Sequence, residues 1–229
     1  LLFYGAGAVV KATHTRNIED MGGLIKIMPR TGIFFLIGSL AICGLPPFNG
    51  FISEFLIYSG LFRSLHNQSL LIIITSLLAI LSLALIGGFA IFCFTKVFGI
   101  VFLGSARSEH TSTETHSNVF MDIGQLLPAL LIITIGLLPS IFVKIIYAVV
   151  KQTYSVNAVD TRSLDIMQYI STGAFFFIIV TLLLTGLRYL LIKLRAYKKG
   201  PTWGCGYDAL TPKHQYTATS YTQEYQKLY

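Results

Sequence analysis

Apolar residues in this chain run in long stretches that no charged residue interrupts. Four windows contain no Asp, Glu, Lys or Arg, and they cover residues 31–53, 64–95, 123–143 and 166–187. The windows extend over 23, 32, 21 and 22 residues, and about 20 apolar residues are enough for a helix to cross the hydrocarbon core of a bilayer. The pattern predicts an all-α fold, a polytopic transmembrane helix bundle.

We expect about four complete membrane segments plus the end of a fifth, in a bundle over residues 1–199. The predicted segments cover about 1–12, 31–62, 70–103, 126–149 and 169–194. Residues 200–229 form an aromatic and polar tail. The chain opens on the apolar stretch Leu1–Val10, with no Met and no basic region before it, so this stretch is not a signal peptide. We interpret the chain as a C-terminal fragment whose first helix begins upstream.

The segment 31–62 is too long to be one straight membrane helix. As a continuous helix it would reach about 48 Å, whereas the hydrocarbon core is about 30 Å thick. Four residues near its middle remove backbone donors or relax the backbone: Gly44, Pro46, Pro47 and Gly50. We predict a discontinuous helix, with helical parts at about 31–45 and 51–62.

The charge content supports the membrane assignment. The 229 residues include 17 Lys or Arg and 10 Asp or Glu, and 54% are hydrophobic, so the charge is about half that of an ordinary soluble domain. The net charge of +7 would favour nucleic-acid binding in a soluble protein. Here the basic residues lie between apolar segments and in the tail. In a membrane protein, such residues indicate which loops face the cytoplasm. We expect the lipid bilayer, and no nucleic acid, as a partner.

The basic residues divide unevenly between the two sides of the membrane. Twelve lie on the side of loop 11–30, loop 104–125 and the tail, whereas four lie on the other side: Arg63, Lys144, Lys151 and Arg162. Because cytoplasmic loops carry the excess of Lys and Arg, we place the first side, with the C-terminus, in the cytoplasm. The prediction is a multi-pass protein of the cell inner (cytoplasmic) membrane.

Glu54 is the only charged residue between Arg30 and Arg63, and it follows the predicted helix break. A charge at the bilayer centre costs roughly 2.5–3.5 kcal/mol on insertion scales, so such residues usually line ion paths. Transporters use broken helices at membrane depth as ion sites. Glu54 is therefore our candidate proton carrier. The alternative is a solvated Glu54 at the far interface, because its segment ends soon afterwards.

Three further residues are candidates for the proton path. Lys96 is the only charge between Arg63 and Arg107, and it could pair with a carboxylate inside the bundle or extend to the interface. Lys11 and His14 follow the first helix and could deliver protons from the cytoplasm. A histidine in a loop can equally be an ordinary surface residue.

The chain shows no pattern for a cofactor or a metal. The three cysteines, Cys43, Cys93 and Cys205, have neither disulfide-framework nor metal-ligand spacing. The stretch Trp203–Tyr207 (WGCGY) contains one cysteine without a second ligand nearby. Phosphate-loop, haem and iron–sulfur spacings are missing as well. We expect no catalytic residue, no cofactor and no redox centre of its own.

Several stretches resemble a known family. His14–Leu24 (HTRNIEDMGGL) and Gly44–Phe55 (GLPPFNGFISEF) resemble the antiporter-like proton-translocating membrane subunits of respiratory complex I, Mrp cation/proton antiporters and membrane-bound hydrogenases. Lys96–Gly104 (KVFGIVFLG), Trp203–Tyr207 and Gln215–Tyr221 (QYTATSY) resemble the hydrogenase branch.

The resemblance implies a function and a position for Glu54. In this family two inverted half-channels each contain a broken helix, and Glu54 falls where the second one carries its terminal channel residue. The chain would be part of a proton-translocating membrane subunit in a hydrogenase-type or NADH-quinone-oxidoreductase-like complex. It would couple electron transfer in other membrane and hydrophilic subunits to proton movement. The first half-channel would precede Leu1, so we expect the chain alone to be unable to pump. The alternatives are a subunit of a secondary cation/proton antiporter and a non-pumping scaffold remnant.

Overall fold

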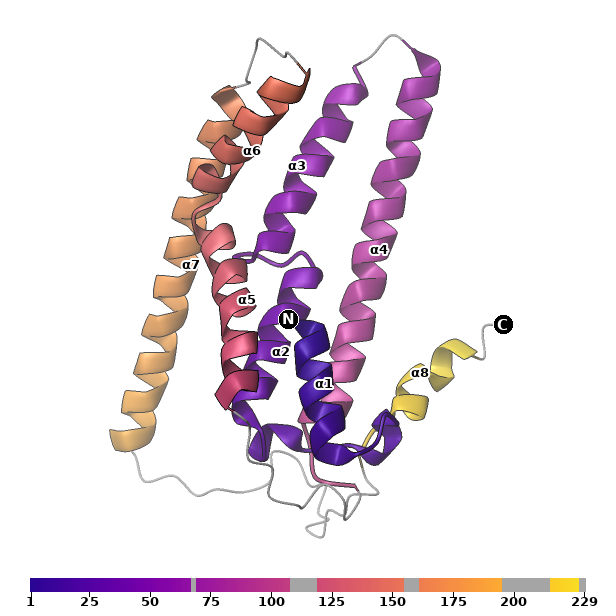
Figure 1. The fold of residues 1–229 in the computed structure, drawn as a ribbon, viewed down its shortest axis with the longest axis vertical. Helices are drawn as coiled ribbons and strands as arrows, with labels where there is room; N and C mark the ends of the chain where they lie inside the picture. The colour runs from indigo at the N-terminus through magenta and orange to yellow at the C-terminus, as the bar shows by residue number, and fades with distance from the viewer. Residues whose placement is uncertain (67–68, 108–118, 155–160, 195–214, 227–229) are drawn as a thin grey trace. The chain divides into compact units, whose positions relative to one another are not determined.

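The computed structural model describes residues 1–66, 69–107, 119–154, 161–194 and 215–226. Every regular element among these residues is helical, which confirms the predicted all-α class. The chain forms two compact units, Leu1–Ile133 with Thr211–Tyr229, and Thr134–Leu210. The α-helices are α1 (Leu2–Thr13), α2 (Pro29–Ile42), α3 (Asn49–Ser64), α4 (Leu70–Phe102), α5 (Val119–Leu137), α6 (Pro139–Tyr154), α7 (Thr161–Leu194) and α8 (Ala218–Gln226), with short 3₁₀ turns η1 (Ile18–Asp20) and η2 (Leu24–Lys26) (Figure 1).

Three described helices are long and apolar enough to cross a membrane. They are Leu70–Phe102 of α4, Val119–Leu137 of α5, and Ile166–Leu194 within α7. Many large apolar side chains on these helices are exposed in the structure, as expected where lipid or neighbouring subunits replace water. The chain is therefore a multi-pass membrane protein, as its charge-free windows predicted.

The pair α2 and α3 forms the discontinuous helix. The two helices have 14 and 16 residues, so each reaches only about 21–24 Å. Pro29 is the first residue of α2, where its missing N–H is not needed. Residues 43–48 separate the helices. Figure 1 shows α3 continuing beyond the end of α2, with α4 running alongside both.

The predicted segment 126–149 corresponds to two helices in the structure. Helix α5 ends at Leu137 and α6 begins at Pro139. Pro139 has no N–H to continue the helical ladder, and its ring disfavours helical geometry at Leu138. The Leu138 N–H still donates to the Thr134 carbonyl at 2.9 Å, so the interruption is short. In the second unit α6 packs against α7, which begins before the predicted residue 169.

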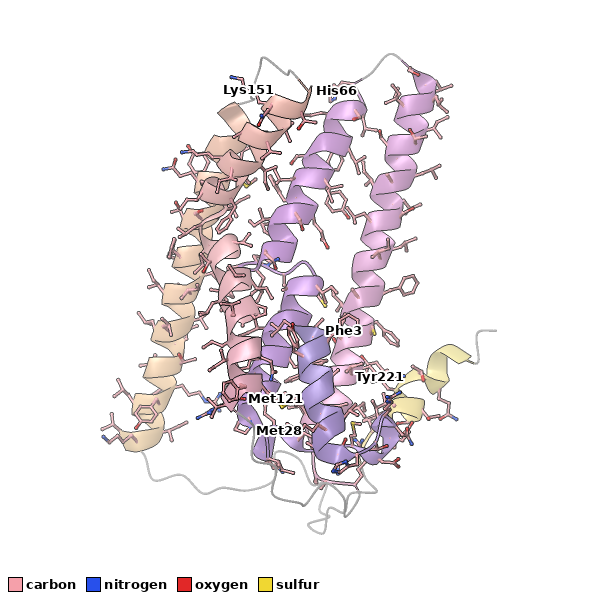
Figure 2. The ribbon with its side chains drawn as sticks, viewed as in Figure 1. Phe3, Met28, His66, Met121, Lys151 and Tyr221 are labelled. Carbon is pink, nitrogen blue, oxygen red and sulfur yellow. The ribbon has the colours of Figure 1, made fainter. Side chains whose placement is uncertain are left out.

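The core of the first unit lies at one end of its helices. It combines residues of α1, the loop that follows, α2 and the end of α4: Ala8, Val9, Ala12, Met21, Leu24, Met28, Phe35, Val101 and Phe102. The Phe102 ring has no exposed surface, and its centroid lies 5.1 Å from that of Phe35 and 5.3 Å from that of Phe98. Figure 2 shows Met28 at this end of the unit. These contacts hold α1, α2 and α4 together.

The described part of the tail also belongs to the first unit. Helix α8 contacts α4 and η1, and polar contacts join the tail to two loops. The division of the chain into a bundle over residues 1–199 and a tail over residues 200–229 stays a prediction. The WGCGY stretch, residues 203–207, lies outside the described residues.

Replacing Phe102 with alanine should strongly destabilise the first unit. A buried Phe→Ala change costs about 3–5 kcal/mol because it removes apolar contacts and leaves a cavity. Thermal unfolding of the detergent-solubilised protein would measure the loss. The matched control is Phe89→Ala on the same helix, because Phe89 is 70% exposed and should change the midpoint little. Equal losses from both variants would contradict this role of the Phe102 cluster.

Candidate functional site

Glu54 lines a cavity next to the interruption between α2 and α3. The cavity measures about 470 Å³ and is lined by the start of α1, the end of α2, the start of α3 and Ile132 of α5. Its polar lining comes from Asn49, Ser53 and Glu54. The Glu54 side chain is half-buried. The Ser53 hydroxyl is engaged locally, since it donates to the Gly50 carbonyl at 2.9 Å.

Two glycines allow the Glu54 carboxyl group to lie against this interruption. Gly44 has φ +65°, and a Cβ there would lie only 2.7 Å from Glu54 Cδ. A Cβ on Gly50 would overlap the carbonyl group of Ala41 at the end of α2. Gly50 therefore needs glycine for the close approach of the Ala41 backbone, and Gly44 for its left-handed backbone, where a Cβ would also displace the Glu54 carboxyl group. The residues predicted to break the helix thus shape the surroundings of the carboxyl group.

The structure does not bring the other predicted site residues into the Glu54 cavity. Lys96 lines a different cavity near the end of α4. Lys11 is exposed near the end of α1, with Nζ 3.9 Å from Met121 Sδ at the start of α5. His14 is the residue that ends α1, with φ 52°, and its N–H donates to the Val10 carbonyl at 2.9 Å. Its side chain is exposed.

An ion pair that the sequence did not single out joins α2 to α5. Arg30 Nη1 donates to Asp122 Oδ2 at 3.0 Å, and the Asp122 side chain is only 12% exposed. Gln125, one turn later, is fully buried and donates from Nε2 to the Met121 carbonyl at 3.2 Å. Within the described part of the chain its Oε1 atom has no hydrogen-bond donor. Arg30 and Asp122 each border a charge-free window, which is the one sequence signal that marked them.

The first family-like motif and the tail contact each other through Glu19. The Glu19 carboxylate accepts hydrogen bonds from the backbone N–H groups of Ala218, at 3.2 Å, and Thr219, and from the Thr219 hydroxyl. Thr217 and Ser220 complete this helix start, since each side-chain oxygen accepts the other residue's backbone N–H, at 3.1 and 2.7 Å. Glu19 thereby caps α8 from a segment far away in sequence.

Hydrogen bonding lowers the pKa of Glu19. The Thr219 hydroxyl is the main cause, partial burial opposes it, and the backbone of Thr219, the Thr217 side chain and the backbone of Ala218 contribute further lowering. Donors that bind the charged carboxylate favour it over the neutral acid. Glu19 is therefore held as an anion at the start of α8, where the helix dipole also favours negative charge.

Cofactor chemistry has little support in the described residues. No group of three His, Cys, Asp or Glu side chains that could hold a metal ion occurs among them. Cys43 and Cys93 are free thiols, and Cys205 lies outside the described part. The Glu54 cavity offers a carboxyl group, which can bind and release a proton.

Comparison with known proteins identifies related membrane subunits. Residues 1–82 match the family described as NADH:quinone oxidoreductase/Mrp antiporter, TM. Hydrogenase-4 component B of Escherichia coli (strain K12) is 34% identical over 93% of this chain and 34% of its own length. Formate hydrogenlyase subunit 3 of the same strain is 29% identical over 91% of this chain and 33% of its own length.

An antiporter subunit is similar over a smaller part. Na(+)/H(+) antiporter subunit A1 of Staphylococcus saprophyticus is 34% identical over 61% of this chain and 18% of its own length. The chain spans about a third of the length of the two hydrogenase-type relatives. The family resemblance inferred from the motifs is confirmed.

Replacing Gly44 with alanine should destabilise the protein, because the new Cβ must enter a left-handed backbone position against the Glu54 carboxyl group. Such strain costs about 1–3 kcal/mol. Gly60→Ala is the matched control, since Gly60 lies within α3 with open space around it and a helical Gly→Ala change gains about 0.5–1 kcal/mol. Thermal unfolding midpoints should therefore shift in opposite directions. A neutral or stabilising Gly44→Ala change would show that the close approach is not required.

Replacing Glu19 with glutamine should loosen the docked tail. Loss of the charged cap should make amide hydrogen exchange in residues 218–223 about fivefold faster at pH 7. In the unaltered protein, the stability that ionised Glu19 gives to the docked tail is fully present above the ordinary Glu pKa of 4.5. This stability is lost as the pH falls through the lowered pKa of Glu19. Asp20→Asn removes a neighbouring charge that does not cap α8 and should leave this exchange unchanged. Unchanged exchange in Glu19→Gln would refute the role of the cap.

Proposed function

Because the chain belongs to the NADH:quinone oxidoreductase/Mrp antiporter membrane family, we propose that it forms part of a proton-translocating membrane subunit. The subunit works in a hydrogenase-type or NADH:quinone oxidoreductase-like complex. Other membrane and hydrophilic subunits carry out electron transfer, and this chain couples the transfer to proton movement. Two relatives that each match more than nine-tenths of the chain, a hydrogenase component and a formate hydrogenlyase subunit, support the hydrogenase-type assignment.

The observation that carries the proposal is the position of Glu54 beside an interrupted membrane helix. A carboxyl group can hold a proton as the neutral acid and release it as the anion, as a relay requires. The adjoining cavity of about 470 Å³ has room for several water molecules, each of which occupies about 30 Å³. Glu54 would bind a proton from one side of the interruption and release it towards the other.

The polar groups at the start of α2 and α5 would supply protons from the cytoplasmic side. The ion pair between Arg30 and Asp122, with buried Gln125 beside it, lies between two membrane helices. Lys11 and His14 lie at the end of α1 on the same predicted side. In this proposal the protein lies in the cytoplasmic membrane with these groups and its C-terminus inside, because the basic residues concentrate there. Lys96 lies outside this route, in a separate cavity.

The second candidate function is cation/proton antiport without electron transfer. The 34% identity to a Na(+)/H(+) antiporter subunit favours it, although the match covers 61% of this chain. The two functions differ in what drives proton movement. A redox-coupled subunit moves protons when the electron donor is added, whereas an antiporter moves them when a Na⁺ gradient is imposed.

Replacing Glu54 with glutamine should abolish proton movement in vesicles that contain the complete complex. Glutamine preserves the size of the side chain but cannot release a proton, so we expect more than a tenfold loss, and Glu54→Asp should retain part of the activity. Proton uptake on addition of the electron donor would be measured with a pH-sensitive dye. Asp20→Asn, an exposed carboxylate in the loop, is the control and should pump normally.

The outcomes separate the candidates. Full donor-driven pumping by Glu54→Gln would refute the role of Glu54. If the unaltered complex moves protons only when a Na⁺ gradient is imposed, it is an antiporter. Assembly of each variant complex would be checked by its subunit composition, so that a loss of pumping is distinguished from a loss of the complex.

A further inference from the structure

A second cavity lies where the end of α4 meets the docked tail. It measures about 360 Å³, and its lining includes Lys96, Arg107, Gln215, Tyr216 and Tyr221. Two of these side chains are cationic, and no Asp or Glu is among the described residues that line the cavity. The cavity is therefore positively charged and favours an anion.

Three hydrogen-bond donors on residues that line this cavity have no acceptor among the described residues. Arg107 Nε and Gln215 Nε2 are buried and lack a partner within the described part of the chain. Lys96 is half-buried, and its ammonium group has no hydrogen-bond or ion-pair acceptor among the described residues. Buried donors are normally paired, so the arrangement is suited to a ligand that supplies several acceptor oxygens.

The remaining contacts of these side chains fix their orientation. Arg107 donates from its terminal nitrogens to the carbonyl groups of Met21, Tyr216 and Ile100, the last two at 2.9 and 3.4 Å. The Gln215 Oε1 atom accepts the Ser105 N–H at 2.9 Å. Carbonyl groups carry no net charge, so these hydrogen bonds do not neutralise the Arg107 guanidinium group. Its positive charge therefore still acts on the cavity. The unpaired Nε atom and the Gln215 amide are held in place before any ligand binds.

An apolar surface on α4 leads away from the cavity along the membrane helix. Phe89, Leu85 and Leu78 precede Lys96 by 7, 11 and 18 residues and therefore lie on its face of the helix. They are 70%, 53% and 58% exposed. Leu85 lies about 17 Å from Lys96 along the helix axis, close to the depth of one leaflet, which is half of the roughly 30 Å hydrocarbon core. Leu78 continues the face to about 27 Å.

We propose that this cavity binds the phosphate of an acidic phospholipid, with an acyl chain along the apolar face of α4. Lys96, Arg107 Nε and Gln215 Nε2 bind the phosphate oxygens, as basic pockets at the cytoplasmic surface bind anionic headgroups. The adjoining apolar face favours a phospholipid over free phosphate. The ring of Tyr221, which lies 5.2 Å from that of Phe92, forms part of the wall (Figure 2).

The lipid joins the tail to the membrane helix. Lys96 belongs to α4, Arg107 to the loop that follows, and Gln215 to the tail, so one phosphate contacts all three segments. Bound lipid should therefore protect the tail from exchange. The site involves neither Glu54 nor its cavity, so the lipid site and the proton path can fail independently.

Lipid binding to the purified, delipidated complex tests this inference. Native mass spectrometry would compare phosphatidylglycerol with the zwitterionic phosphatidylcholine, and hydrogen exchange would follow residues 218–223. We expect phosphatidylglycerol to bind preferentially and to slow exchange of the tail. Lys96→Gln should weaken this binding about fivefold to tenfold, and Lys96→Arg should restore most of it. Lys26→Gln removes an exposed charge from the same predicted side and is the matched control.

Each outcome decides the inference. Equal phosphatidylglycerol binding by Lys96→Gln and the unaltered complex would overturn the site. Equal binding of the two lipids at the Lys96-dependent position would overturn the assignment to an acidic headgroup. If millimolar inorganic phosphate alone slows tail exchange in a Lys96-dependent way and lipid does not, the ligand is free phosphate and the assignment to a phospholipid is wrong. Loss of pumping in Glu54→Gln with normal lipid binding would leave the lipid site supported.

Discussion

The structure depends on the need to pair backbone hydrogen-bonding groups inside a membrane, where no water replaces a missing partner. Helices meet this need within each segment, and every regular element among the described residues is helical. The main exception at membrane depth is residues 43–48. There the N–H groups of Gly44, Leu45 and Phe48 donate to the carbonyls of Ala41, Leu40 and Leu45, at 3.2, 3.2 and 3.1 Å. Because these backbone N–H groups are hydrogen-bonded, the interruption can leave room for a carboxyl group and a cavity without exposing unpaired backbone N–H groups to lipid.

The two halves of the discontinuous helix are packed differently. Six residues of α2 are buried, including Phe35 in the aromatic cluster with Phe102, whereas Ile52 is the one residue of α3 that is buried. The first half is thus fixed by the core of its own unit. The second half, which carries Glu54, has surface left for neighbouring helices. This asymmetry agrees with the proposed function, in which other parts of a larger complex complete the proton path.

Polar contacts in the first unit hold the described part of the tail against α4 and the loop between α1 and α2. Glu19 caps α8, and Arg107 connects α4, the loop between α1 and α2, and the tail through three carbonyl groups. Arg107 and Gln215, which line the second cavity, each keep a buried donor without a partner among the described residues. The apolar core lies beside this polar surface and supports it. Glu54 and Lys96 line separate cavities, so the proposed proton chemistry and the proposed lipid recognition occupy different places.

The sequence by itself determined the all-α fold class, the multi-pass character and the helix break. Long windows without charged residues indicate helices that cross a membrane, and paired prolines interrupt a helix through their own backbone chemistry. It also marked Glu54, since a lone carboxylate in an apolar window is conspicuous. It did not separate α5 from α6, because one proline within an apolar run is compatible with either one helix or two. Tertiary structure alone decided the Arg30–Asp122 pair, the Glu19 cap and the Lys96 cavity. Each brings together side chains from segments far apart in the chain, and no local pattern encodes which of them meet.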